Sequence, residues 1–375
     1  MEEKLERAVA LCVGGYHILL SDEQGSIWGA GDNSRGQLGQ LPLAKVGVYN
    51  EGANIKTLKK IQNLPPIISI HAARFRSFFI DFDGSVWACG ENESGQLGAG
   101  EVEMSMPHKI SGICNIENIF SSTYWTFFQD RAGQLWGCGV TDNFEESRVE
   151  PSQKHVIQMN TQLPGLKAIV LNKYHCLYVD AAGDVWENKP RQLNAAFFDG
   201  WEKAIEFPNV QAVSSGANHT MFLDQSSRVW GLGDNNFRQC GLGRKNEVEN
   251  AIRKPMILEN IPEIKEIQTG TSFSLLLDVD GCVWAFGYNG QGQLGIEGEN
   301  FNVNRKFRPK KLANLPVIAK IYCGHYFSML LDENGELWGS GSLRFQTHKP
   351  VTFERLQGLP EVVLYRNLRI KSARN

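Results

Sequence analysis

Short apolar runs separated by polar turns follow one another along the chain. The segment IKEIQTGTSFSLLLDVDGCVW (264–284) contains an apolar run, a break at glycine, a second run, a polar turn and a third run that ends in tryptophan. The segments VQAVSSGANHTMFLDQSSRVW (210–230) and IAKIYCGHYFSMLLDENGELW (318–338) repeat this order. Turns such as DVDG and DENG are typical of hairpins, because Gly and Asn adopt positive φ at low cost. The pattern predicts short antiparallel strands with almost no helix.

A tryptophan at the end of the third strand marks each repeat. Successive tryptophans are 44 to 59 residues apart, and such a period is typical of repeat architectures. A fourth strand follows in each unit, as in RKPMILENIP (253–262). Seven units of four strands predict an all-β, seven-bladed β-propeller that forms a single domain over residues 1–375, with a short basic tail at 366–375. The repeat tryptophans are Trp28, Trp87, Trp136, Trp186, Trp230, Trp284 and Trp338.

A glycine-rich segment follows several of these tryptophans and looks like a phosphate-binding loop. The clearest copies are WGAGDNSRGQLG (28–39), WACGENESGQLG (87–98) and WAFGYNGQGQLG (284–295). A nucleotide site would need a strand, a glycine loop and a helix, with an acidic residue further on, and that context is absent. We therefore interpret the segment as a tight turn at the end of the third strand. The glutamine of GQLG is expected to bond the turn backbone, and the small residue after each tryptophan to make room for the neighbouring blade.

Composition excludes several classes of function. The net charge of −3 and the pI of about 6.3 give no general attraction to nucleic acid. The eight cysteines include no C-x-x-C pair and mostly lie in apolar runs, which predicts buried free thiols in a reducing compartment. There is no run of about 18 apolar residues, so no membrane span is expected, and the N-terminal residues lack the pattern of a signal peptide. Neither H-E-x-x-H nor a triad spacing is present, and we expect no metal, no cofactor and no hydrolase site.

The repeated sequence pattern of the chain resembles the regulator of chromosome condensation repeat. The pattern is G-x-x-H-x-x-x-L … G-x-V-W-x-x-G-x-N-x-x-G-Q-L-G. The resemblance covers nearly the whole chain and is most specific in the second and sixth units. It implies a seven-bladed propeller. It places the family histidine at His17, His175, His219 and His325, and replaces it by Ser77, Trp125 and Ser274 in the other units. We expect these histidines to bond backbone inside the blades rather than to act as catalytic bases.

This resemblance also implies a partner. The best-known member of the family is a guanine-nucleotide exchange factor for the small GTPase Ran. Other members are ubiquitin-ligase accessory domains, a plant UV-B photoreceptor and bacterial effectors that act on host Ran. A small GTPase of the Ran type is therefore the expected partner, with action in the cytoplasm or nucleus of a eukaryotic cell, either from within or as a bacterial effector. Only Trp125 and Trp201 lie outside the repeat position, which disfavours a photoreceptor.

The third unit departs from the repeat in a way that the resemblance explains. Its segment GCGVTDNFEESRVEP (137–151) skips the GQLG turn. The founding member of the family displaces nucleotide with a protruding wedge in the same blade. The resemblance therefore assigns the exchange wedge to Asp142, Asn143, Phe144 and Glu145.

Six residues outside the wedge are expected to bind the partner. They are Tyr124, Trp125, Tyr174, His175, His219 and His325. In the founding member an acidic residue precedes the histidine of the fourth unit, and Tyr174 stands there in this chain. SSTYWT (121–126) stands at the matching place in the third unit. Two interpretations remain open: exchange through the wedge, or a non-catalytic scaffold that binds a GTPase or another protein on one rim.

Three smaller features have simple explanations. The segments RAVALCVGG (7–15) and EVVLYRNLRI (361–370) both resemble a first strand, and we expect one of them to close the ring while the other lies outside. The acidic pairs Asp81/Asp83 and Asp278/Asp280 are interpreted as solvated hairpin turns. The basic runs at 305–311 and 366–374 are interpreted as solvated segments.

Overall fold

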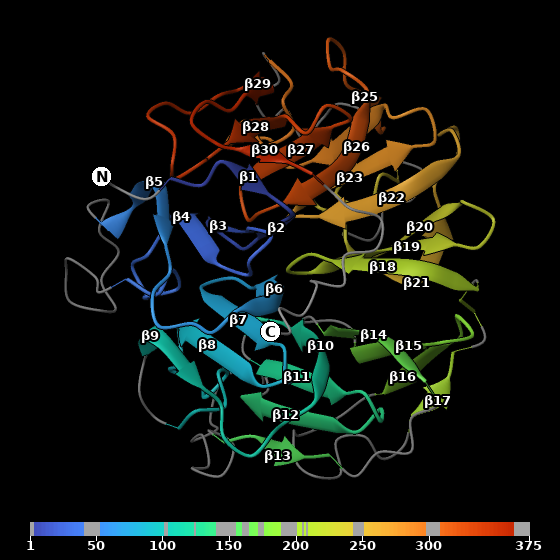
Figure 1. The fold of residues 1–375 in the computed structure, drawn as a ribbon. Helices are drawn as coiled ribbons and strands as arrows, with labels where there is room; N and C mark the ends of the chain where they lie inside the picture. The colour runs from blue at the N-terminus through green and yellow to red at the C-terminus, as the bar shows by residue number, and fades with distance from the viewer. Residues whose placement is uncertain are drawn as a thin grey trace.

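The chain folds into seven four-stranded antiparallel sheets arranged around an axis (Figure 1). The structure is a computed structural model that describes residues 4–40, 53–100, 104–123, 125–139, 155–159, 165–171, 176–188, 201–204, 206–207, 209–242, 251–297 and 308–363. In these ranges all regular structure is strand. The all-β, seven-bladed propeller predicted from the repeat is confirmed.

Each blade takes its strands from consecutive residues, innermost strand first. Blade 1 contains β2 (Ala10–Val13), β3 (His17–Ser21), β4 (Ile27–Gly31) and β5 (Ile55–Lys60). Blade 2 contains β6 (Ile67–Ala72), β7 (Arg76–Asp81), β8 (Val86–Gly90) and β9 (Met104–Lys109). Blade 3 contains β10 (Ile116–Ser121), β11 (Trp125–Asp130), β12 (Leu135–Gly139) and β13 (Ile157–Gln158). Blades 4 and 5 contain β14 (Leu166–Leu171), β15 (Cys176–Asp180), β16 (Val185–Asn188), β17 (Glu202–Lys203); and β18 (Val210–Ser215), β19 (His219–Asp224), β20 (Val229–Asp234), β21 (Ala251–Ile257). Blades 6 and 7 contain β22 (Ile264–Thr269), β23 (Phe273–Asp278), β24 (Val283–Gly287), β25 (Lys310–Lys311); and β26 (Ile318–Cys323), β27 (Phe327–Asp332), β28 (Leu337–Gly341), β29 (Glu354–Arg355).

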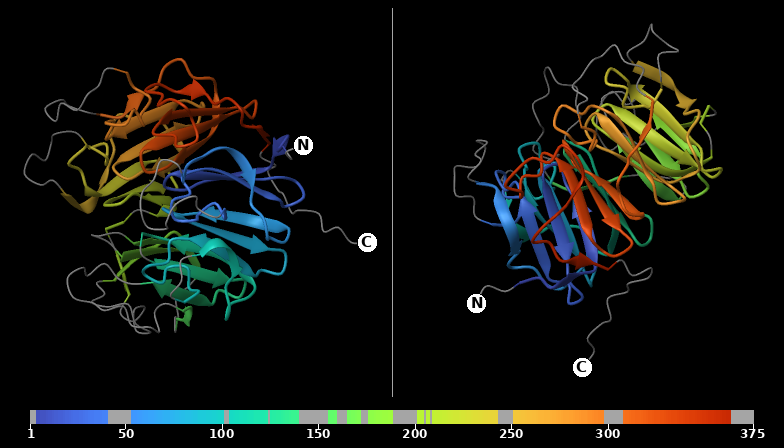
Figure 2. Two further views of the ribbon diagram at one scale, coloured as in Figure 1. Left: turned by 90° about the vertical axis from the view of Figure 1, so that its left-hand side faces the viewer. Right: turned by 90° about the horizontal axis from the view of Figure 1, so that it is seen from above.

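The ring is closed by a short parallel pair at its seam. Strand β1 (Arg7–Ala8) pairs with β30 (Glu361–Val362), and blades 1 and 7 lie side by side (Figure 2). The Val362 amide donates to the carbonyl of Gly335, which lies in the turn before the third strand of blade 7. Elsewhere in the ring the carbonyl at this position accepts the amide of the first residue of the next blade. Both terminal segments therefore join the ring, and the expectation that one of them lies outside is wrong. Blade 7 already holds four strands, so β30 pairs with the residues that precede blade 1.

The second strand of each blade forms the centre of the core, because both faces of a blade pack against neighbours. Every described side chain of β7, β19, β23 and β27 is buried. The repeat tryptophans pack between blades, as predicted. Trp28 is 3% exposed and lies in a cluster with Phe327 and Met329 of blade 7, and Trp87 packs with Leu19 of blade 1.

An aspartate at the end of the second strand holds both the tryptophan and the following turn. Asp81 accepts the indole N–H of Trp87 at 3.0 Å and the amides of Asp83 and Ser85 at 3.1 and 2.8 Å. These donors compensate the carboxylate for its burial. The interpretation of Asp81 and Asp278 as solvated was wrong, since they are only 8% and 3% exposed. The same indole bond joins Trp186 to Asp180, Trp230 to Asp224, Trp284 to Asp278 and Trp338 to Asp332.

The glycine-rich segments are tight turns, as expected. In blade 1 the Gln37 side chain accepts the amide of Arg35 at 3.0 Å, and the copies in blades 2, 5 and 6 repeat this bond. Gly36 has φ +78°, and a Cβ there would lie 2.5 Å from the Cα of Ser105 in blade 2. The residue after the tryptophan serves a different purpose from the one predicted. A Cβ on Gly29 would lie 2.6 Å from Leu38 of its own turn, so the space is for that leucine and not for the next blade.

All described cysteines are free thiols, as predicted. Cys89, Cys138 and Cys240 are buried, and burial raises the pKa of Cys89 and Cys138 to about 12. Cys114 differs from the prediction, because it lies exposed in the segment before β10. Within the described ranges no helix is long and apolar enough to cross a membrane.

Candidate functional site

The two faces of the propeller carry different turns. Face A, as we call it, carries the turns between the first and second strands and the segments that follow the third strands. Face B carries the turns between the second and third strands. The pairing of Trp125 with Gly139 at the ends of β11 and β12 lies on face A. Gly139, the last described residue before 140–154, therefore lies on face A.

A cavity of about 600 Å³ lies on the propeller axis at face A. Residues of all seven blades line it. Its described lining includes Arg74, His71 and His325 but no aspartate or glutamate. Within the described part of the chain no three His, Cys, Asp or Glu side chains are placed to hold a metal ion.

The turns around this cavity are joined to one another by backbone hydrogen bonds. The Ala217 amide of blade 5 donates to Thr271 of blade 6 at 3.2 Å, and the Thr271 amide donates to His325 of blade 7 at 3.4 Å. The His325 amide donates to Gly15 of blade 1 at 2.8 Å, and the Gly15 amide donates to Ala73 of blade 2 at 3.2 Å. These bonds link five of the seven blades in series, which holds their turns in a common arrangement.

Half-buried aromatic side chains form a continuous arc on face A, which we call the aromatic arc. Phe75 stacks on Tyr16 at 5.4 Å between ring centroids, and Tyr16 lies 6.2 Å from Tyr326. The arc continues from Tyr326 to Tyr288 at 6.2 Å and from Tyr288 to Phe237 at 5.2 Å. His325 packs edge-on against Tyr16 at 4.9 Å. The arc therefore crosses blades 5, 6, 7, 1 and 2.

Two guanidinium groups lie over the arc. Arg74 lies 5.1 Å from the ring centre of Phe75, and Arg344 lies 5.4 Å from that of Tyr16. Both contacts are in the range of cation–π attraction. Aromatic rings and arginine are the residues enriched at the energetic centres of protein interfaces. The chemistry of the arc is therefore that of a protein-binding surface.

The family histidines join blades inside the core. His17 Nε2 lies 3.0 Å from Ser77 Oγ, and His219 Nε2 lies 3.0 Å from Ser274 Oγ. Each serine donates its own proton to the carbonyl of a glutamine in the preceding blade, so the histidine is the donor in each pair. His17 and His219 have no exposed surface, and burial lowers their pKa to about 3. His219, which we expected to bind the partner, therefore offers no surface to it in this structure.

The strand register corrects the assignment of the histidine position in three blades. His17 and His219 pair with Gly31 and Gly233. In blades 2, 6 and 7 this place is taken by Arg76, Phe273 and Phe327, which pair with Gly90, Gly287 and Gly341. The serines assigned there, Ser77 and Ser274, lie one residue later. His325 lies two residues earlier, in the turn, which brings it to the cavity and the arc.

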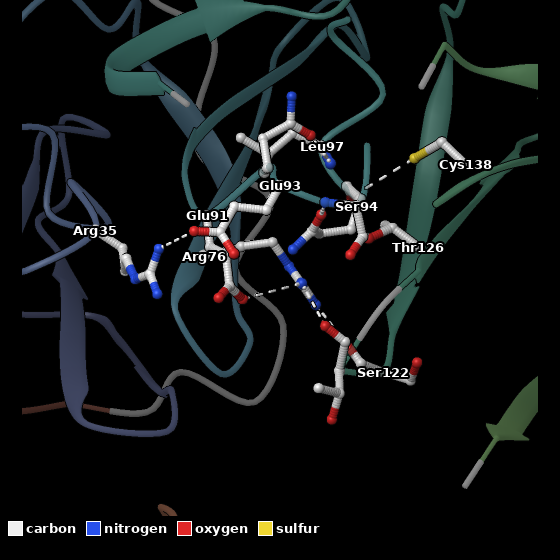
Figure 3. Close-up of polar contacts among 12 residues, drawn as sticks. Arg35, Arg76, Glu91, Glu93, Ser94, Leu97, Ser122, Thr126 and Cys138 are labelled. Atoms are coloured by element: carbon white, nitrogen blue, oxygen red, sulfur yellow. Dashed lines mark hydrogen bonds and ion pairs between the residues drawn. The ribbon is translucent and has the colours of Figure 1, made fainter. Parts of the chain in front are cut away.

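Arg76 is a buried charge that the sequence analysis missed. Its guanidinium reaches from blade 2 to blade 3, where Nη1 donates to the Thr123 carbonyl at 2.8 Å and Nη2 donates to the Ser122 carbonyl (Figure 3). Glu91 lies 4.0 Å from Nη1 and is 14% exposed. Burial lowers the pKa of Arg76 to about 10, so it stays charged at neutral pH. Counting five residues back from the aspartate that ends each second strand would have found it.

The remaining predicted residues divide into two groups. Trp125 lines the cavity, is 6% exposed and meets Phe127 edge-on at 4.4 Å. The others lie outside the described residues, so the wedge and its neighbours stay a prediction. They are Asp142, Asn143, Phe144, Glu145, Tyr124, Tyr174 and His175.

Comparisons with known proteins agree with this geometry. Two models described as regulator of chromosome condensation (RCC1) repeat match residues 83–128, 226–277 and 280–331, and residues 8–37, 210–239 and 264–293. Together these matches cover more than half of the chain.

Two curated relatives have names that refer to GTPases or guanine nucleotides. The chain is 23% identical over 359 residues to the guanine nucleotide exchange factor SRM1 of Saccharomyces cerevisiae, covering 89% of this chain and 70% of that protein. It is 30% identical over 144 residues to the X-linked retinitis pigmentosa GTPase regulator homolog of Caenorhabditis elegans, covering 37% of this chain and 10% of that protein. The chain thus spans about a tenth of the nematode relative.

Solved structures share the fold. Yeast RCC1 (Prp20), solved with Kap60 bound, superposes with a TM-score of 0.70 at 20% identity, over 86% of this chain and 82% of that one. A structure of Prp20p from Saccharomyces cerevisiae, described with its binding properties to Gsp1p and histones, gives a TM-score of 0.52 at 20% identity, over 93% and 76%. Human WBSCR16 gives 0.52 at 15% identity, over 94% and 82%.

Proposed function

We propose that this chain, which belongs to the regulator of chromosome condensation (RCC1) repeat family, binds a small GTPase of the Ran type through face A. We further propose that it accelerates the release of guanine nucleotide, as an exchange factor does, in the cytoplasm or nucleus of a eukaryotic cell. The alignment with a yeast guanine nucleotide exchange factor over 89% of the chain supports this proposal.

The observation that carries the proposal is the composition of face A. The aromatic arc, with Arg74 and Arg344 over its rings, lies on the same face as Gly139, the last described residue before the predicted wedge. Half-buried rings that already contact one another lose little conformational freedom when a partner binds, which favours affinity. His325 and Trp125, both expected to bind the partner, line the cavity on this face.

Exchange requires no covalent chemistry from the propeller. A protein that binds the nucleotide-free GTPase better than the loaded form weakens nucleotide binding by the same free energy. A coupling of about 4 kcal/mol corresponds to roughly a thousandfold loss of nucleotide affinity. In this proposal Phe144, with Asp142 and Asn143, presses on the phosphate-binding region of the GTPase, and Glu145 repels the phosphates.

A second candidate is a scaffold that binds a GTPase or another protein on face A without exchange. The residues that favour it are Tyr174 and the SSTYWT segment (121–126), which stand where the founding member of the family has acidic residues. Both candidates use the aromatic arc. They differ in whether residues 142–145 act on the nucleotide site.

The experiment that separates them measures release of a fluorescent guanine nucleotide from purified Ran. The chain is added in catalytic and in stoichiometric amounts, as wild type, as Phe144→Ala and with residues 141–147 replaced by a glycine linker. Acceleration that both variants abolish supports exchange through the wedge. A stable complex on a sizing column without acceleration favours the scaffold, and the absence of both overturns the proposed partner.

A further inference from the structure

We infer that Arg76 is a positioning residue: on face A it takes the place of the turn-to-turn backbone bond, which the described residues of blades 2 and 3 do not form, and it holds Ser122 and Thr123 in place. Its importance for the partner rests on the proposed function, because the partner is expected to dock on this face. Arg76 itself has no exposed surface, so it acts through the residues that it holds.

The first step of the argument is the place that Thr123 takes in the ring of turns. Thr123 corresponds to Gly15, Thr271 and His325 in the blades where turn is joined to turn. There the carbonyl of each of these residues accepts a backbone amide of the preceding blade. The Thr123 carbonyl accepts the Arg76 guanidinium at 2.8 Å instead. A side chain thus makes between blades 2 and 3 the link that the backbone makes from blade 5 to blade 2.

The second step is the shape of the guanidinium. Its planar fork presents several donors in a fixed geometry, and it holds the two successive carbonyls of Ser122 and Thr123 (Figure 3). A histidine, which takes this place in blades 1 and 5, reaches a serine hydroxyl of the next blade. The hydroxyl at the equivalent position of blade 3 is Thr126, which donates to the Gln96 carbonyl at 2.7 Å. Blade 3 therefore keeps the group that a histidine would bind.

The third step connects the clamp to face A. The Ser122 amide donates to the Trp125 carbonyl at 3.0 Å and closes the turn. Trp125 then pairs with Gly139, the last residue of β12. The contacts thus run from Arg76 through the closed turn and the Trp125–Gly139 pair to the end of β12. After this point the sequence of the third blade departs from the repeat. Displacing Ser122 and Thr123 shifts Trp125 and the end of β12 with them.

The substitution that tests this is Arg76→His, because it keeps a side chain able to join the blades through Thr126 and removes the carbonyl clamp. We expect the Trp125 amide and its neighbours in the turn to exchange with deuterium about tenfold faster. The melting temperature should also fall, because two carbonyls lose their donor. Binding of the nucleotide-free GTPase should weaken and nucleotide release should slow, each by about tenfold or more. Arg76→Lys keeps the charge without the fork. Its effects on deuterium exchange, GTPase binding and nucleotide release should lie between those of the wild type and of Arg76→His.

A matched control is Ser328→Ala, which removes a buried bond of 2.7 Å to Gln293 between blades 6 and 7. It should lower the melting temperature without changing deuterium exchange in the blade 3 turn. Unchanged exchange in that turn in both Arg76→His and Arg76→Lys overturns the clamp. Faster exchange with unchanged GTPase binding and release overturns its role for the partner. If the wild type neither binds nor releases, the proposed function fails, and the deuterium measurement still decides the clamp.

Discussion

The indole of Trp87 donates a hydrogen bond to the carboxylate of Asp81, six residues earlier in the same blade, at 3.0 Å. The same carboxylate accepts two turn amides. The pair therefore fastens the second strand, the turn and the third strand together, and four other blades contain the same indole bond. It is a structural device of the repeat and lies toward face B, away from the proposed docking surface.

Replacing the buried carboxylate should destabilise the fold. Asp81→Ala leaves the Trp87 indole and two turn amides without their acceptor, and we expect a loss of about 2–4 kcal/mol in the free energy of unfolding. Asp83→Ala is the matched control, because Asp83 is exposed in the same turn and should change stability by less than about 0.5 kcal/mol. Urea denaturation followed by tryptophan fluorescence measures both. Equal losses in the two variants would contradict the assignment.

The aromatic arc should carry much of the affinity for the partner. Tyr16→Ala removes the ring that contacts both Phe75 and Tyr326, and we expect the Kd for nucleotide-free Ran to rise by about 30-fold, or 2 kcal/mol. Phe82→Ala is the control, because Phe82 is 59% exposed in a turn on face B. Titration calorimetry compares the two variants. A control that weakens binding as much as Tyr16→Ala would move the docking surface away from the arc.

Stability should fall as the pH is lowered below neutrality. His17 and His219 are buried, which lowers their pKa from 6.5 to about 3, so the unfolded chain binds more protons than the folded chain between these values. The full free energy of unfolding is therefore present above pH 6.5, and the loss due to these histidines grows as the pH falls toward 3. At pH 5 each histidine should cost about 2 kcal/mol.

The variants His17→Gln and His219→Gln test the origin of this dependence. Glutamine has an amide that can donate to Ser77 or Ser274, and it does not titrate. The melting temperature of each variant should fall less between pH 7 and pH 5 than that of the wild type. An identical slope in both variants would assign the acid sensitivity to other groups.

The thiols should differ in reactivity. Cys114 is the exposed thiol among the described cysteines, while Cys89, Cys138 and Cys240 are buried. Burial also raises the pKa of the Cys89 and Cys138 thiols to about 12, so little of the reactive thiolate is present at neutral pH. Iodoacetamide followed by mass spectrometry should label Cys114 first in the native protein. Early labelling of Cys89 would show that the blades open more readily than this packing allows.

The local features of the fold could be predicted because they are set within about 20 residues of chain. Strand, turn and tryptophan follow one another in each unit, so the seven blades and the turns of the glycine-rich segments are written in the sequence itself. The interpretation of Asp81 as solvated was wrong, because the hairpin pattern fixes the turn but not the burial of its carboxylate. The exposure of a turn carboxylate depends on which indole and which amides surround it, and a hairpin pattern does not state that.

The order of residues determined how many blades form and where each one lies in the chain, because hydrogen bonds within a blade join segments that are close in sequence. Only the tertiary structure decided what links one blade to the next. Arg76 meets carbonyls almost fifty residues away, and Ala8 pairs with Val362 from the other end of the chain. The aromatic arc likewise unites residues of five blades. Such contacts depend on how the blades stand around the axis, and no local pattern contains that geometry.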